Sequence, residues 1–163
     1  MTTQTDKSKQ LIEAAQAHII ENLTPAETLD AYRDHLNEIY EDCLTGPFSH
    51  MSPAKLLEED DETAFRCGHN DWLDSECTDG RYVYIGNDYF DPCDVRDSLE
   101  DWIDTQREPL AALAAQITEL EERRAECVSE DEAEAIEENI DTLQAQYDEL
   151  DTALDDVESN FDL

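Results

Sequence analysis

Two runs of apolar residues with heptad spacing constrain the fold of this chain most strongly. Each run alternates steps of four and three residues, the first from Leu99 to Cys127 and the second from Ile136 to Val157. This spacing places all members of a run on one side of an α-helix, where another helix can cover them. The members are Leu99, Ile103, Gln106, Leu110, Leu113, Ile117, Leu120, Arg124 and Cys127 in the first run, and Ile136, Ile140, Leu143, Tyr147, Leu150, Leu154 and Val157 in the second.

A short break between the two runs predicts how their helices are joined. Ser129 and Glu132 have the spacing of a capping box, so a new helix is expected to begin at about Glu130. Pro109 lies inside the first run and is expected to kink or restart that helix, because proline lacks the backbone donor. Two heptad helices with a tight break favour an antiparallel helical hairpin, within one chain or across a dimer.

The first third of the chain predicts two amphipathic helices. Residues 7–22 carry one apolar face. Thr24, Pro25 and Glu27 have the pattern of a capped helix start, and the helix they open is expected to extend to about Cys43. Its apolar stripe comprises Leu29, Tyr32, Leu36, Ile39, Tyr40 and Cys43.

The middle of the chain predicts two shorter helices and one β-hairpin. Ser52 and Pro53 open a helix by the same chemistry, and residues 62–74 are expected to form another. Residues 81–90 are rich in β-branched and aromatic side chains around a Gly-Asn turn, which is typical of a small hairpin. We therefore predict a mostly α fold. A small α-rich domain at 1–93, with its hairpin near 81–90, precedes an acidic helical coiled-coil hairpin at 94–163.

The charge of the chain excludes several classes of partner. Asp and Glu number 44 and Lys and Arg 10, a formal net charge of −34. Direct binding of nucleic acid or of an anionic membrane needs a basic surface, so neither is expected. No apolar window approaches 18 residues and the N-terminus lacks the apolar core of a secretory signal. Together with five cysteines, this predicts a cytoplasmic protein with free thiols.

The second heptad helix is acidic on a scale that points to mimicry of DNA. It carries 13 acids between Glu130 and Glu158, and no Lys or Arg follows Arg124. A helix of this length spans about 43 Å, or one carboxylate per roughly 3.3 Å, and a DNA strand carries a phosphate about every 3.4 Å. A coiled coil selected only for stability would carry basic flanking residues. The candidate partner-binding residues are Glu134, Glu137, Glu138, Asp141, Asp148, Asp151, Asp155 and Asp156.

Two other interpretations of this region stay open. In the first, the apolar seam and the Tyr-rich hairpin serve a protein–protein adaptor or a homodimer, so that Leu143→Asp would matter and charge neutralisation would not. In the second, the acidity is an adaptation to high salt, and the protein would unfold below about molar salt as screening is lost.

No catalytic motif is present, and neither an enzymatic activity nor a cofactor is expected. Asp88, Asp91 and Asp94 alternate in a loop but lack the central Gly and terminal Glu of a calcium-binding EF-hand. Other potential metal ligands fit no compact zinc knuckle and are interpreted as ordinary thiols and a histidine, with a zinc site as the alternative. These four residues are Cys67, His69, Cys77 and Cys93. Cys43 and Cys127 lie on apolar stripes and are expected in the core.

Residues 52–74 carry three short motifs: Ser-Pro-x-x-x-Leu from Ser52, Asp-x-x-Ala-Phe-Arg from Asp61, and Asp-Trp-x-Asp from Asp71. With the hairpin that follows, this segment of about 40 residues resembles short phage and prophage proteins. In physical terms, Phe65 is expected to fill a core with Trp72, and Arg66 to pair with nearby acids.

The resemblance implies an origin on a mobile element and no active site. Antirestriction and anti-CRISPR proteins that mimic DNA are also small, acidic and phage-borne. We therefore expect a non-enzymatic inhibitor of a host nucleic-acid-binding defence complex, of restriction or CRISPR type, in the cytoplasm of the host cell.

Overall fold

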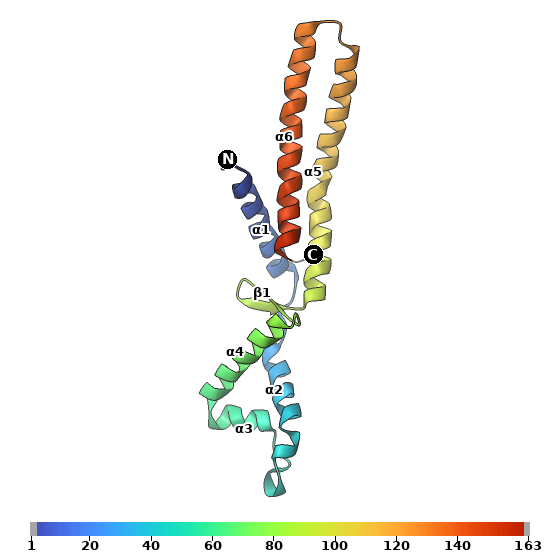
Figure 1. Ribbon diagram of the computed structural model, residues 1–163. Helices are drawn as coiled ribbons and strands as arrows, with labels where there is room; N and C mark the ends of the chain where they lie inside the picture. The colour runs from blue at the N-terminus through green and yellow to red at the C-terminus, as the bar shows by residue number, and fades with distance from the viewer. Residues whose placement is uncertain (1–2, 162–163) are drawn as a thin grey trace. The chain divides into compact units, whose positions relative to one another are not determined.

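The computed structural model describes residues 3–161, and these are almost entirely helical (Figure 1). The elements are α1 (Thr3–Asn22), α2 (Thr28–Ile39), the 3-10 turns η1 (Glu41–Cys43) and η2 (Gly46–Phe48), α3 (Pro53–Asp60), α4 (Glu62–Thr78), β1 (Val83–Ile85), β2 (Asp88–Phe90), α5 (Pro92–Glu126) and α6 (Glu130–Asn160). The predicted mostly α fold with one small antiparallel hairpin is confirmed. Among the described residues, no helix combines the length and the apolar character that crossing a membrane requires.

Backbone contacts divide the chain into two compact units. One unit joins the chain up to Asn22 with the chain from Arg96 onward, and the other is Leu23–Val95. The predicted domains, 1–93 and 94–163, placed α1 with the wrong partner; residues 1, 2, 162 and 163 of these ranges lie outside the described residues. The apolar face of α1 predicted that the helix is covered, but a face does not say by which element.

The first unit is an antiparallel hairpin of α5 and α6 with α1 packed against α6 (Figure 1). The heptad positions supply its core, so the hairpin forms within one chain. Ala15 and Ile19 of α1 are fully buried as well. Ser8 Oγ donates a hydrogen bond to Asp156 Oδ2 at 2.6 Å. The buried heptad residues are Leu99, Ile103, Leu110, Ile117, Ile136, Leu154 and Val157.

Two local predictions for the hairpin differ from the structure: of the kink or restart expected at Pro109 the restart does not occur, and the capping box at Ser129 does not form. The helix does not restart at Pro109, because α5 passes through this residue without interruption. Pro109 is exposed, so solvent can replace the missing backbone donor. Ser129 is the N-cap of α6, but its side chain accepts no hydrogen bond, so the capping box with Glu132 does not form.

The N-terminal ends of α1 and α2 also differ from the prediction. α1 begins at Thr3 rather than at residue 7, with Asp6 favourably placed in its first turn. α2 begins at Thr28, because the Ala26 backbone N–H donates to the Tyr89 carbonyl at 2.7 Å and holds the preceding segment against β2. The expected cap of Thr24 and Pro25 is therefore not formed.

The far end of α2 is shorter and more exposed than its apolar stripe predicted. The helix ends at Ile39, and a single 3-10 turn follows instead of a further helical turn. Tyr32 and Leu36 are buried. The remaining members of the stripe are exposed, namely Leu29, Ile39, Tyr40 and Cys43.

The second unit has a core in which α2, α3 and α4 meet. Tyr32, Leu36, Ala54 and Phe65 are buried there, with Trp72 packed against them.

The ends of α3 and α4 and the hairpin are fixed by local chemistry. Ser52 caps α3 by accepting from Lys55 N at 3.2 Å, as its sequence predicted, and Asp61 caps α4. β1 pairs with β2 through a turn in which Gly86 has a φ of 68°, a conformation that favours glycine. Tyr84 lies opposite Tyr89 in the register of the hairpin.

Candidate functional site

Most of the predicted partner-binding residues form one continuous stripe along α6. Steps of four, three, four, seven and seven residues return a side chain to nearly the same side of a helix. This side faces away from Ile136, Leu154 and Val157, which are buried. Every member is exposed. The α6 acidic stripe consists of Glu130, Glu134, Glu137, Asp141, Asp148 and Asp155.

The other three predicted residues lie outside this stripe. Glu138 is exposed beside it, and Asp151 is half-buried. Asp156 is engaged by the hydroxyl of Ser8, so its carboxylate is committed to the packing of α1. The structure therefore brings five of the eight predicted residues onto one face.

Basic residues from other helices pair with some of the acids of α6. Arg124 bridges α5 and α6 by contacting Glu137 at 2.9 Å. Lys7 of α1 contacts Glu149 at 3.7 Å, and Arg107 contacts Glu158. The flanking basic positions that α6 lacks in its own sequence are thus supplied in part by its neighbours. Glu137 is the only stripe member that makes an ion pair within the described residues.

The geometry of the stripe corrects the comparison with DNA. The stripe extends over about 38 Å, so its six carboxylates are spaced by about 7.5 Å on average along the axis, with single steps from about 4.5 to about 10.5 Å. The figure of one acid per roughly 3.3 Å counted carboxylates on all sides of the helix. One face of α6 therefore carries, on average, one carboxylate for about every second phosphate of a DNA strand, where phosphates recur about every 3.4 Å.

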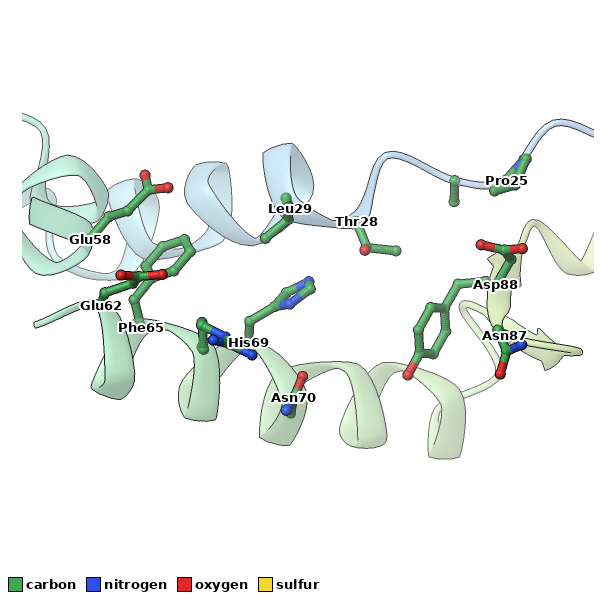
Figure 2. Close-up of a pocket in the computed structure, with 13 residues that line it drawn as sticks. Pro25, Thr28, Leu29, Glu58, Glu62, Phe65, His69, Asn70, Asn87 and Asp88 are labelled. Carbon is green, nitrogen blue, oxygen red and sulfur yellow. The ribbon is translucent and has the colours of Figure 1, made fainter.

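A cleft in the second unit is the other candidate site. Its volume is about 530 Å³. One face of α4 forms its floor, where Glu62, Phe65, Arg66, His69 and Asn70 follow helical spacing. The start of α2, Glu58 and the β1–β2 turn complete the wall. Figure 2 shows Glu62 near one end, Asp88 near the other, and the His69 ring between them, turned toward α2.

His69 is the most constrained polar group of this cleft. Its Nε2 atom is buried and has no hydrogen-bond partner in the described part of the chain. Burial lowers the pKa of His69 below its ordinary value of 6.5; a hydrogen bond to the Thr28 backbone opposes this shift, and the positive charge of Arg33 adds to it. The imidazole is therefore neutral near pH 7, with its Nε2 atom buried and without a partner in the described part of the chain.

Aromatic packing fixes the position of this ring. Its centroid lies 5.4 Å from that of Tyr32 and 6.1 Å from that of Trp72. Tyr32 also passes so close to α4 that a Cβ added at Gly68 would meet its hydroxyl oxygen at 2.3 Å. A glycine beside His69 is thus required by the approach of α2 to α4.

Arg66 departs from the sequence-based expectation. It was expected to pair with nearby acids, but across residues 3–161 it makes no ion pair. The other basic residues of this unit, Arg33, Lys55 and Arg81, all contact carboxylates. An unpaired guanidinium is therefore a specific feature of the cleft.

The potential metal ligands do not converge. Cys67 and His69 are two residues apart on α4, a spacing that points side chains to different sides. Within the described residues, no group of three or more His, Cys, Asp or Glu side chains could hold a metal ion. Cys93 is exposed, whereas burial raises the pKa of the Cys77 thiol. Cys43 is exposed rather than in the core, because α2 ends before it.

No protein-family model, curated protein or solved structure matches the chain. The two candidate sites therefore rest on the chain's own residues. Sequence reasoning found the stripe through its charge but missed the cleft. The signal available for the cleft was the spacing of polar residues around Phe65 on one face of α4, whereas its opposite wall comes from segments distant in sequence.

Proposed function

We propose that this protein is a non-enzymatic inhibitor that presents the α6 acidic stripe to the phosphate-binding surface of a nucleic-acid-binding protein. The observation that carries the proposal is the row of exposed carboxylates on the face of α6 opposite its buried seam. Five of the six make no ion pair with any described residue, so their charge is available to a partner.

Electrostatics supports a basic surface as the partner. A row of like charges on one face creates a strong local potential, which attracts a surface of opposite sign and speeds association. Surfaces that bind nucleic acid carry Lys and Arg at the positions of the phosphates. A carboxylate at every second phosphate position would occupy part of such a surface without being a substrate.

The resemblance of residues 52–74 to phage proteins supports a narrower proposal about the target. In this proposal the partner is a host defence complex of restriction or CRISPR type, and the protein acts in the cytoplasm of the host cell. The second unit would then serve as the scaffold inherited with the mobile element.

A protein–protein adaptor is the second candidate function, and exposed apolar side chains favour it. Ile39, Phe48 and Tyr84 are each more than half exposed, at 52%, 58% and 55%. The heptad seam is covered only in part, because Leu154 and Val157 are buried whereas Leu143 is half-buried. An adaptor could therefore use the second unit or the middle of the seam, and Leu143→Asp tests the latter once its folding has been checked.

Capture from a nuclease-treated bacterial lysate tests the proposed function. The tagged full-length protein is immobilised, and bound proteins are eluted in parallel with high salt and with duplex DNA. We expect a nucleic-acid-binding protein that both treatments release, because phosphates and carboxylates compete for the same cations. A partner that neither salt nor DNA releases would reject mimicry and favour the adaptor.

A further inference from the structure

We propose that the cleft between α2 and α4 binds an extended peptide segment of a partner protein, with basic side chains on both sides of an apolar one. A volume of about 530 Å³ lies within the usual range of roughly 300–1,000 Å³ for ligand sites. The proposal concerns only Leu23–Val95 and is independent of the α6 acidic stripe.

The middle of the cleft holds two polar groups without a protein partner in the described part of the chain, Arg66 and His69 Nε2. Arg66 has no carboxylate partner among the described residues, although this unit contains 18 acids and only four basic side chains. His69 Nε2 is buried without a partner there as well. A hydrogen bond to the Thr28 backbone occupies the other ring nitrogen, so Nε2 of the neutral ring is an acceptor. In a bound peptide, a backbone carbonyl would pair with Arg66 and a backbone N–H with His69 Nε2, and leaving either group unsatisfied costs free energy.

The two ends of the cleft require positive charge. Glu62 lies near one end and Asp88 near the other (Figure 2). Both side chains are exposed, and neither makes an ion pair with any residue in the described range. Glu58 is different, because Arg33 holds it in a two-pronged contact at 2.8 and 3.1 Å. Glu62 and Asp88 are therefore the carboxylates open to a ligand.

The wall of the cleft between these ends is apolar. Leu29 lines it and is 46% exposed, so its side chain is open to a ligand. An apolar side chain of the peptide would cover Leu29. A free anion would be attracted by Arg66 alone. The carboxylates at the two ends of the cleft and the net negative charge of the unit would repel it. The arrangement therefore favours a basic–apolar–basic peptide over an anionic ligand.

Nuclear magnetic resonance with a defined peptide tests this proposal on the full-length protein. The probe is acetyl-Arg-Leu-Arg-amide, added to ¹⁵N-labelled protein. We expect saturable shifts concentrated at residues 62–70 and 87–89. Acetyl-Arg-Gly-Arg-amide has the same charge without the apolar side chain, and we expect it to bind several-fold more weakly. Shifts spread over α6, or equal affinity of the two peptides, would overturn the proposal.

Matched variants separate the cleft from general attraction to an acidic protein. Glu62→Gln with Asp88→Asn removes the two terminal carboxylates, and Glu134→Gln with Asp148→Asn removes the same charge from α6. The cleft pair is expected to weaken the peptide about fivefold, the effect of losing two exposed ion pairs. The α6 pair should leave affinity within about twofold, because its charges are remote in sequence and screened. Equal weakening by both pairs would contradict the proposed site.

Discussion

The two units of this protein have similar charge density but use their acids differently. The unit of α1, α5 and α6 has 26 acidic and 6 basic side chains, and the unit Leu23–Val95 has 18 and 4. In the second unit, several acids have structural partners: Glu58 binds Arg33, and Glu76 binds Arg81 at 2.6 Å. Along the outer face of α6, a single stripe member, Glu137, has an ion pair among the described residues.

This difference teaches that composition alone does not locate an electrostatic surface. A carboxylate that caps a helix, as Asp61 does, or that pairs with an arginine, already has a partner within the fold. A carboxylate that recurs with helical spacing opposite a buried seam is free to meet a partner. The placement of the acids, rather than their number, distinguishes the candidate binding face.

The largest expected effects come from removing core side chains, and they sharpen the division into two units. Phe65→Ala should cost about 3–5 kcal/mol, and Leu154→Ala about 2–5 kcal/mol, because both residues are fully packed. Hydrogen exchange should show lost protection in α2–α4 for the first variant and in α1, α5 and α6 for the second. Loss of protection throughout the chain in either variant would contradict two separate cores.

The next effect tests the close approach of α2 to α4. Gly68→Ala should lower the free energy of unfolding by about 1–2 kcal/mol, since overpacking outweighs the better helix propensity of alanine. Adding Tyr32→Phe removes the hydroxyl that the new Cβ would meet at 2.3 Å and leaves the ring carbon at 3.4 Å. The double variant should recover most of the loss in urea denaturation. Absence of recovery would show that the hydroxyl does not set the limit.

The pH dependence of the second unit follows from His69. Because its pKa is lower in the folded protein than in the unfolded chain, the unfolded state binds the proton first as the pH falls through 6.5. The contribution of His69 to the stability of this unit should therefore be constant above about pH 7 and fall below pH 6.5. His69→Gln should remove this part of the slope between pH 7 and 5.5, measured by urea midpoints. An unchanged slope would assign it to other groups.

The smallest effect concerns the ion pair between α5 and α6. Glu137→Gln breaks the contact with Arg124 and should cost less than about 0.5 kcal/mol, because both side chains are about half exposed. Thermal unfolding followed by circular dichroism measures this loss, and the difference in stability between the variant and the unmodified protein should vanish in 1 M salt. In these thermal scans the unmodified protein should be helical at low salt. Unfolding there would instead support adaptation to high salt.

The fold of the first unit was largely predictable from sequence, because its apolar residues recur with heptad spacing. Sixteen residues in two regular runs identify two helices and the side on which they meet. The placement of α1 was not predictable, because an apolar face specifies burial without specifying a partner. Local caps were predicted unevenly: Ser52 forms its cap, whereas Ser129 and Thr24 do not. Backbone contacts such as that between Ala26 and Tyr89 decide such cases.

The two candidate sites also differ in how far they could be predicted from local sequence. The α6 acidic stripe is local, so the sequence located five of its six residues in advance, although it also included Asp156, which binds Ser8. The cleft joins Leu29, His69 and Asp88, which are separated by tens of residues. Its buried nitrogen and its unpaired arginine appear only when these segments are placed together. A surface on one helix can therefore be predicted from sequence, whereas a site formed by segments distant in the chain cannot.

Capture of the partner by two matched variants tests the central claim most directly. Both lose four acids, three Asp and one Glu, and every replaced residue is exposed. The stripe variant carries Glu134→Gln, Asp141→Asn, Asp148→Asn and Asp155→Asn, and the control variant carries Asp34→Asn, Glu38→Gln, Asp60→Asn and Asp71→Asn.

We predict that the stripe variant retains several-fold less of the partner and loses most of its salt dependence, while the control variant behaves like the unmodified protein. Equal retention by all three proteins would contradict the assignment of the α6 acidic stripe as the binding surface.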